Sequence, residues 1–324
     1  MNCLSQTVVL VLLTLIYLLP LNAVARPPRE TTSNKEDPAA KEDPKKTEDK
    51  KPAPYSVEII SDIRYRTDKD ADPEKHKLDL YLPKGQKNFP VLFFVHGGEW
   101  RKGYKEEYKM LGELFAGQGI GTVVINYRLS PQVQHPAQIQ DVARAFAWTR
   151  QHIGEYGGKP DQIVVMGHSA GAHLVALLAT DEQYLKDVDL SQRDVRGVIN
   201  VSGVPVLSPL IPMIRQAFGK TQKVCRDASP YYHVAGKLPP FLLLFAEHDI
   251  PTLGRMNDDF YEALQKNNTE VTLEEIDNRN HVTVLTDIVN ESDPTREFIF
   301  QFLAKYTDWK RDPASKPSTS GKKP

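Results

Sequence analysis

The stretch Ile163-Val164-Val165-Met166-Gly167-His168-Ser169-Ala170-Gly171, which runs into an apolar segment ending at Ala179, decides the fold. Four consecutive apolar residues predict a short strand covered on both faces, and the longer apolar segment predicts a helix. Between them, Gly167, Ser169 and Gly171 match the pattern Gly-x-Ser-x-Gly. Its glycines allow a turn too sharp for side chains, and its serine is held in a strained conformation. A strand, a sharp turn and a helix are therefore expected.

Similar patterns extend outward from this stretch. Short, nearly all apolar segments lie at Val91–Val95, Thr122–Asn126, Ile163–Met166, Val198–Val201 and Phe241–Phe245, with Val271–Ile276 as a last strand near one edge. Val57–Arg66 and Lys77–Leu82 alternate polar and apolar residues, as an antiparallel edge pair does. Helical patterns lie near 105–117, 137–152, 170–179, 253–266 and 294–306. This order predicts an α/β fold with about eight strands, a mostly parallel sheet and helices on both faces.

Residues 204–233 fit neither a strand nor a long helix, because prolines interrupt them at 205, 209, 212 and 230. They predict either a small cap over the site or an ordinary loop with one short helix.

The two ends of the chain differ from its middle. Residues 1–25 hold an apolar run too short to span a bilayer, followed by Ala23-Val24-Ala25, which predicts a cleaved signal peptide and an exported protein, periplasmic or secreted. A buried N-terminal helix is the alternative. Residues 26–54, rich in Lys, Glu, Asp and Pro, predict a disordered linker. Residues 55–308 form the predicted α/β domain, and 309–324 a disordered basic tail.

Composition narrows the partners. The charges of the 41 basic and 42 acidic residues nearly cancel, so the protein has no overall positive potential that would attract nucleic acid. Cleavage of the signal peptide would leave Cys225 without a second cysteine to pair with, and the mature protein is not expected to insert stably into a membrane. The spacing of Cys and His residues does not suggest a metal site. We expect no cofactor, and the oligomeric state stays open.

The hydroxyl of Ser169 needs a base and a carboxylate to orient that base before it can act as a nucleophile. In folds with this turn, the chain order is serine, acid, histidine. Asp249 follows the strand 241–245 and His281 follows the last strand, so both fall at carboxyl ends of strands, where open α/β sheets place their sites. The sequence therefore predicts Ser169, Asp249 and His281 as a catalytic triad.

Each partner has rivals in the sequence. The other acids near Asp249 are Glu247, Asp258 and Asp259, but the last two fall inside the next predicted helix. The other histidines after Ser169 are His248, which precedes the acid, and His233, which lies in the segment 204–233.

An oxyanion also needs hydrogen-bond donors. His96-Gly97-Gly98-Glu99-Trp100 follows the strand Val91–Val95, and its glycines let main-chain N–H groups turn toward a substrate. The N–H of Ala170 lies at a helix N-terminus. Gly97, Gly98 and Ala170 are the predicted oxyanion hole. An ordinary Gly-Gly turn is the alternative.

The motifs together resemble a known family. The segments concerned are His96-Gly97-Gly98-x-Trp100, Asn126-Tyr127-Arg128-Leu129-Ser130, His135-Pro136-Ala137 with Asp141, Gly167 to Leu174, and Asn280-His281. Over residues 75–290 the chain resembles the hormone-sensitive-lipase-like and kynurenine-formamidase-like branch of the α/β-hydrolases, and is similar to bacterial acetyl-xylan and feruloyl esterases. The resemblance implies a cofactor-free esterase that uses the triad named above.

The chain departs from this family at Glu99, where relatives often carry Gly or Ala. Its side chain would repel anionic substrates, orient a substrate hydroxyl, or point to solvent. Trp100 and Tyr104 either line the substrate pocket or only pack.

Five further polar residues are read as structural. His96 shapes the oxyanion loop, and His168 and His173 are packing residues. Asp141 and Arg128 form an ion pair.

The motifs predict a serine hydrolase of small soluble or carbohydrate-linked esters. Hydrolysis of the amide in N-formylkynurenine needs the same triad and is the nearest alternative. A lipase would want a larger apolar cap, and a non-catalytic binding module would usually have lost a triad residue.

Overall fold

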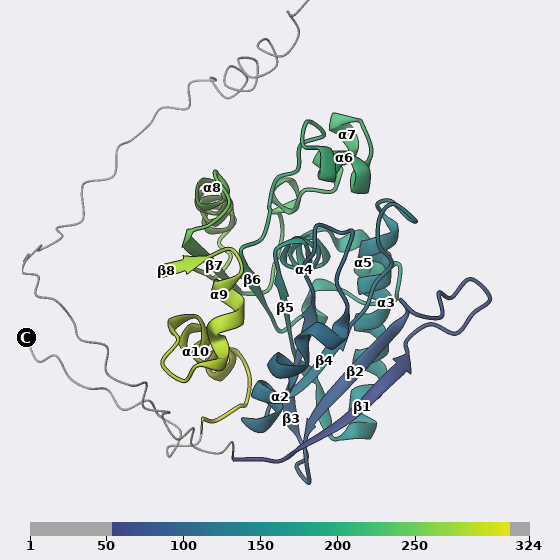
Figure 1. The fold of residues 1–324 in the computed structure, drawn as a ribbon, viewed down its shortest axis with the longest axis vertical. Coiled ribbons are helices and arrows are strands. Elements are labelled where there is room, and N and C mark those ends of the chain that lie inside the picture. Colours follow the sequence, from purple (N-terminus) through teal and green to yellow (C-terminus); the bar gives the residue numbers. More distant parts are fainter. Residues whose placement is uncertain (1–53, 312–324) are drawn as a thin grey trace, which may run out of the picture. The chain divides into compact units, whose positions relative to one another are not determined.

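The fold is known from a computed structural model that describes residues 54–311 (Figure 1). The predicted signal peptide, nearly all of the predicted linker and all but three residues of the predicted tail lie outside the described residues, so they stay predictions. Between residues 54 and 311, no helix combines the length and the apolar character that crossing a membrane requires.

One sheet organises the described residues. Its strands are β1 (Val57–Arg64), β2 (Lys77–Pro83), β3 (Phe89–Val95), β4 (Gly121–Ile125), β5 (Gly158–His168), β6 (Gly197–Val201), β7 (Phe241–His248) and β8 (Val271–Asn280). Their spatial order is β1-β2-β4-β3-β5-β6-β7-β8, with β2 antiparallel to both its neighbours and all other pairs parallel. This confirms the predicted eight-stranded, mostly parallel sheet.

The strand β8 is longer than the predicted 271–276. It is an edge strand whose last residues are polar and largely exposed, so they lack the apolar pattern that marks the buried strands. Its pairing with β7 nevertheless continues to His248 and Asn280, past an irregularity after Ala246. His281 therefore comes directly after the strand.

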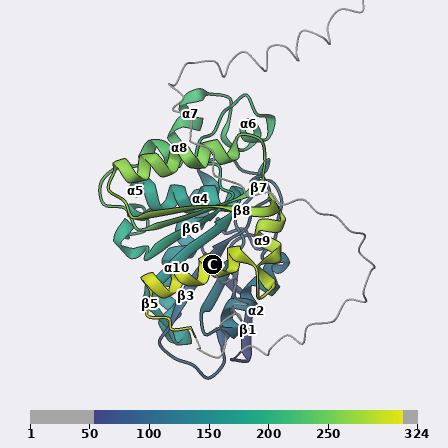
Figure 2. The ribbon, with the colours of Figure 1, turned by 90° about the vertical axis from the view of Figure 1, so that its left-hand side faces the viewer.

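Helices cover both faces of the sheet. The α-helices of the described residues are α2 (Lys109–Gly117), α3 (Ala137–His152), α4 (Ala170–Thr180), α5 (Glu182–Lys186), α6 (Pro212–Phe218), α7 (Gln222–Asp227), α8 (Leu253–Lys266), α9 (Thr283–Thr286) and α10 (Pro294–Tyr306). The buried residues of α3, α4 and α8 share one core cluster, and those of α2 and α10 share the other. Figure 2 shows α8 and α10 on opposite sides of the sheet.

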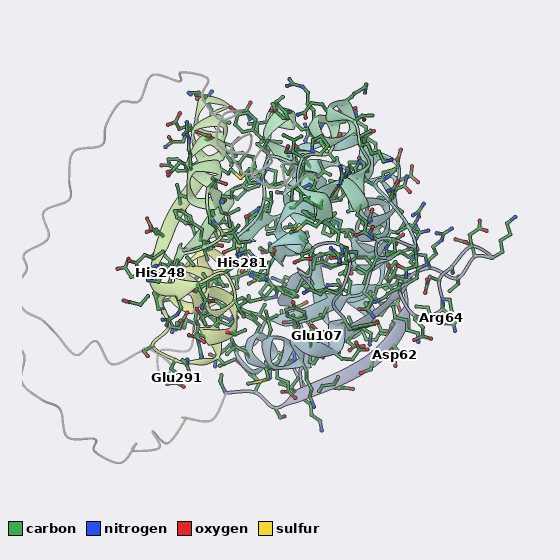
Figure 3. The ribbon with its side chains drawn as sticks, turned by 45° about the horizontal axis from the view of Figure 1, so that its top comes forward. Asp62, Arg64, Glu107, His248, His281 and Glu291 are labelled. Carbon is green, nitrogen blue, oxygen red and sulfur yellow. The ribbon has the colours of Figure 1, made fainter. Side chains whose placement is uncertain are left out.

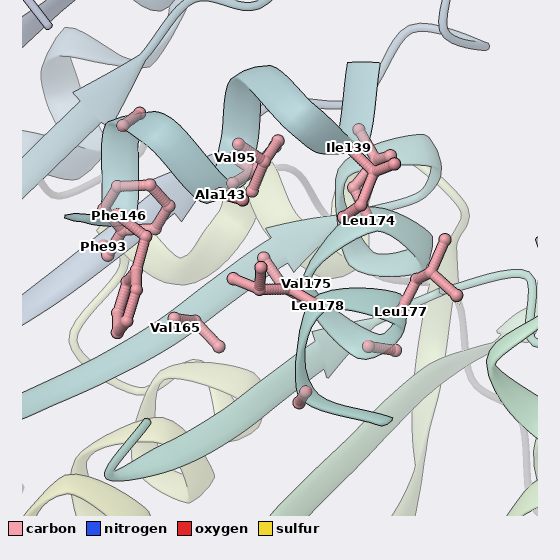
Figure 4. Packing of buried hydrophobic residues seen from close by; sticks show 14 of the residues in the cluster. Phe93, Val95, Ile139, Ala143, Phe146, Val165, Leu174, Val175, Leu177 and Leu178 are labelled. Atoms are coloured by element: carbon pink, nitrogen blue, oxygen red, sulfur yellow. The ribbon is translucent and has the colours of Figure 1, made fainter. Parts of the chain in front are cut away.

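Alternation along β3 divides the core between the two faces. Phe93 and Val95 belong to the cluster under α3 and α4, whereas Phe94 belongs to the opposite cluster. Figure 4 shows Phe93 beside Phe146 of α3, and the two rings meet edge to face with centroids 5.6 Å apart. The central strands are buried on both faces, which explains their nearly continuous apolar sequence.

The segment 204–233 folds as α6, α7 and a 3-10 turn, so it is a small helical insert and contains more than one short helix. It is anchored by Phe218, whose buried ring packs edge to face on Trp100 and His173. The N–H of His135 also donates to the carbonyl of Ala217 at 2.8 Å.

Candidate active site

Ser169 lies in the sharp turn between β5 and α4. Its φ of 53° and ψ of −117° are a strained conformation for a residue with a side chain, and such strain is typical of functional turns. A Cβ atom on Gly171 would lie 2.0 Å from the carbonyl oxygen of Val95, and one on Gly167 would lie 2.4 Å from the carbonyl carbon of Gly171. Only glycine fits at either position, as the sequence pattern predicts.

The turn brings Ser169 to a histidine and an aspartate from two other loops. The Oγ of Ser169 lies 2.9 Å from Nε2 of His281, and Nδ1 of His281 lies 2.6 Å from Oδ1 of Asp249. Because a carboxylate only accepts hydrogen bonds, Nδ1 carries the proton in the neutral ring and Nε2 can accept from the serine hydroxyl. Ser169, His281 and Asp249 thus form one continuous hydrogen-bonded chain.

Asp249 is held as a carboxylate by several donors. Its side chain is 4% exposed and accepts from Oγ of Ser202 at 2.5 Å, from the N–H of Ala246 at 3.1 Å and from the N–H of Ile250 at 2.8 Å. Burial alone would raise the pKa of Asp249, but the hydrogen bonds from His281, Ser202 and the main chain hold it below its usual value. Sequence reasoning missed Ser202; its only signal was a polar residue directly after β6.

The rival residues lie elsewhere. Glu247 accepts the N–H of Asn278 at 2.8 Å, and Asp258 and Asp259 lie in α8. His248 is 66% exposed, and Figure 3 shows it toward the margin of the molecule while His281 lies further in. His233 lies in the helical insert, where its Nε2 is 2.7 Å from the carbonyl oxygen of Asp227.

The loop after β3 forms a left-handed turn. Gly98, Glu99 and Trp100 have φ angles of 107°, 59° and 58°, and the N–H groups of the next two residues bond the carbonyl of Gly98. Within residues 54–311, the N–H groups of Gly98, Glu99 and Ala170 bond no acceptor. Burial raises the pKa of the neighbouring Tyr108 hydroxyl, and the main chain of Gly97 lowers it in part.

The side chains of this loop take three different environments. Trp100 is 2% exposed, so it packs inside the fold and does not line an open pocket. Tyr104 is half exposed, with the ammonium of Lys75 3.6 Å from its ring centroid. The carboxylate of Glu99 lies 3.7 Å from the guanidinium of Arg101, and both side chains are exposed by about two fifths, at 39% and 42%.

Trp100 links the loop to its surroundings. Its Nε1–H donates to Nδ1 of His173 at 3.3 Å, and Nε2 of His173 lies 2.8 Å from the carbonyl oxygen of Ala228. The loop after β3, α4 and the helical insert are therefore joined through the buried imidazole of His173.

His96, His168 and His173 are uncharged near pH 7. Burial lowers the pKa of His96 and His168 to about 4 and that of His173 to about 3. His96 stacks on Tyr127 with ring centroids 4.4 Å apart, and its Nδ1 lies 2.7 Å from the carbonyl oxygen of Gly97. This contact is consistent with its predicted role in shaping the loop.

Asp141 and Arg128 form the predicted ion pair. The carboxylate is fully buried and lies 2.7 Å from Nη2 and 2.8 Å from Nε of the guanidinium. Burial would raise the pKa of Asp141, but hydrogen bonds from His76 and Arg128 keep it lowered. The pair fixes the loop after β4 to α3. In the part of the chain that the structure describes, no cluster of His, Cys, Asp or Glu is arranged to hold a metal.

The sequence of the chain is similar to those of several curated hydrolases. The chain is 32% identical over 219 residues to a probable isoprenylcysteine alpha-carbonyl methylesterase of Arabidopsis thaliana, covering 60% of this chain and 46% of the relative. It is 35% identical over 178 residues to a probable carboxylic ester hydrolase of Mycobacterium tuberculosis, covering 49% and 41%. A kynurenine formamidase of Danio rerio is 26% identical over 258 residues, covering 77% and 83%. The chain therefore spans less than half the length of the first two relatives.

A solved structure resembles the fold of the chain, and a family model matches its sequence. A truncated carbohydrate esterase from gut microbiota superposes with a TM-score of 0.68 at 20% identity, covering 78% of this chain and 97% of that one, which supports the α/β-hydrolase fold. The family described as BD-FAE matches residues 78–264, more than half of the sequence. The chain therefore belongs to the BD-FAE family and has an α/β-hydrolase fold.

Proposed function

We propose that the protein is a serine carboxylic-ester hydrolase whose nucleophile is Ser169. The observation that carries this proposal is the continuous hydrogen-bonded chain from Asp249 through His281 to Ser169. The ester-hydrolase names of two curated relatives support it.

The reaction starts when the Oγ of Ser169 attacks the ester carbonyl carbon and Nε2 of His281 takes the hydroxyl proton. Asp249 stabilises the imidazolium that results. The imidazolium then protonates the leaving alcohol, and the acyl group stays on Ser169. Water attacks this acyl-enzyme by the same route, His281 takes its proton, and release of the acid restores the hydroxyl.

The oxyanion of each tetrahedral intermediate needs donors that no protein acceptor occupies. The N–H groups of Gly98 and Ala170 meet this requirement, and so does that of Glu99, which the sequence did not suggest. The N–H of Gly97, the third donor that the sequence predicts, stays part of the proposed oxyanion hole. The left-handed turn holds the donors of Gly98 and Glu99 in place before substrate arrives, and the start of α4 holds that of Ala170.

The substrate class of this proposal is small soluble or carbohydrate-linked esters. The helical insert is short, which favours small esters over lipid surfaces. The name of the structural neighbour, a carbohydrate esterase, agrees with the carbohydrate-linked option.

A second candidate is hydrolysis of the amide in N-formylkynurenine. The observation that favours it is the match to the kynurenine formamidase of Danio rerio, most of whose length the chain covers. The same three residues would perform it, because only the leaving group changes from an alcohol to an amine.

Export is part of the proposal and rests on the sequence of residues 1–25. N-terminal sequencing of the mature protein should begin at Arg26. An intact Met1 on the mature protein would contradict export.

The test of the function is an activity panel with purified residues 26–324. It holds acetylated xylan, feruloyl esters, p-nitrophenyl esters of rising chain length, and N-formylkynurenine. Turnover of p-nitrophenyl acetate is expected, and the preferred substrate separates the two candidates. Failure to hydrolyse any ester would contradict the proposed function.

A further inference from the structure

His168, the residue before the nucleophile, does more than pack. We propose that His168 is a positioning residue, which holds the main chain of His281 to the turn that carries Ser169. This inference rests on the proposed function, because it concerns the placement of the proposed base.

The contact is direct. The Nε2 atom of His168 lies 2.7 Å from the carbonyl oxygen of His281, and the two rings are inclined by 42° with centroids 5.0 Å apart. Ser169 meets the other end of the same residue, with its Oγ 2.9 Å from Nε2 of the His281 ring. Two consecutive residues of the turn thus hold both the main chain and the side chain of His281.

The carbonyl acceptor determines which ring nitrogen of His168 carries the proton. A carbonyl oxygen only accepts, so Nε2 of His168 carries the hydrogen. Burial lowers the pKa of His168 to about 4, so the ring stays neutral near pH 7 and does not compete for the proton of Ser169. The bond is therefore present in every protonation state through which His281 passes.

The His168 ring also lies beside the loop after β3, which carries Gly97. A Cβ atom on Gly97 would lie 3.1 Å from Nδ1 of His168 and 3.0 Å from its main-chain oxygen. The imidazole consequently occupies the space between the loop after β3 and the loop after β8. Gly97 is the residue that leaves room for it.

The ring of His281 is fixed by its bond to Asp249, but the main chain of its loop is shaped mainly by local bonds. His281 lies between the end of β8 and the short helix α9, and its neighbour Val282 is 58% exposed. The bonds that shape the loop are local ones, from the N–H groups of Val282 and Thr283 to the side chain of Asn280. A misplacement of about 1 Å at a reacting group can cost about a hundredfold in rate.

Two substitutions separate the bond from the packing. In His168→Gln the terminal amide nitrogen replaces Nε2 and can still donate to the carbonyl of His281. In His168→Phe the ring volume is kept but the donor is lost. His135→Phe is the control, because it removes a partly buried histidine that lies outside the proposed machinery.

The readouts are kcat and KM with p-nitrophenyl acetate, together with the melting temperature. We expect kcat of His168→Phe to fall by about tenfold to a hundredfold while KM stays within about threefold. His168→Gln should recover most of the rate, and the control should keep its kcat. Full activity in His168→Phe, or equal losses with Phe and Gln, would overturn the inference.

A variant that does not fold, or a wild-type protein without esterase activity, requires a different measurement. Should His168→Phe not fold, His168→Asn takes its place: its shorter amide cannot reach the carbonyl, so kcat must fall with Asn and not with Gln. Should the wild-type protein turn over no ester, the proposed function fails, and the labelling rate of Ser169 with a fluorophosphonate becomes the readout. That rate must fall with Phe and recover with Gln; equal labelling, or none in the wild type, would refute the positioning role.

Discussion

Ser202→Ala tests how the structure keeps Asp249 charged. The substitution removes the donor that lies 2.5 Å from Oδ2 of a carboxylate whose side chain is only 4% exposed. A hydrogen bond to a buried charge contributes about 1.5–3 kcal/mol. We therefore expect the free energy of unfolding at pH 7 to fall by about 1.5–3 kcal/mol in urea titrations.

The loss of stability in Ser202→Ala should depend on pH. Because the folded pKa of Asp249 lies below the unfolded value of about 3.9, its stabilisation is present above that pH and is lost as the pH falls through the folded pKa. The difference between variant and wild type should therefore shrink below about pH 4.

The control for this test is Ser191→Ala. Its hydroxyl lies 3.0 Å from the carboxylate of the partly exposed Asp194, so a smaller loss is expected. A loss below about 0.5 kcal/mol for Ser202→Ala, or one independent of pH, would refute the reasoning.

Three other substitutions follow from the packing, each measured by urea or thermal unfolding. Trp100→Phe keeps an aromatic ring but leaves Nδ1 of His173 buried without a donor, which should cost about 1–3 kcal/mol; a change below about 0.5 kcal/mol would count against that bond. Gly171→Ala places a Cβ atom 2.0 Å from the carbonyl oxygen of Val95, so the main chain must move at a loss of about 3 kcal/mol, and an unchanged melting temperature would contradict the tight turn. Asp141→Asn removes the buried charge that its arginine partner needs and should cost about 3–5 kcal/mol; a nearly neutral effect would show that the pair is not needed.

The sequence predicted the parts of the fold that have a local cause. The buried strands carry continuous apolar runs, and Gly167 and Gly171 mark the sharp turn because a side chain would collide there. Asp249 and His281 could be chosen because each follows a strand, and the register of β7 and β8 then brings them within hydrogen-bond distance.

The remaining features depend on contacts between distant segments. Ser202 bonds Asp249 across 47 positions, and His168 bonds the carbonyl of His281 across 113. No spacing rule relates such pairs. The free N–H of Glu99 and the burial of Trp100 both depend on the path of a left-handed loop. The sequence shows only which residues are present in that loop.

The most direct test of the central claim is the rate of p-nitrophenyl acetate hydrolysis by Ser169→Ala beside the wild type. Each protein is also treated with a fluorophosphonate, and the labelled peptide is identified by mass spectrometry. We expect kcat to fall by about a thousandfold or more, and the label to appear on Ser169 of the wild type and to be absent from the variant. Equal rates, or a label on another residue, would contradict the assignment of Ser169 as the nucleophile.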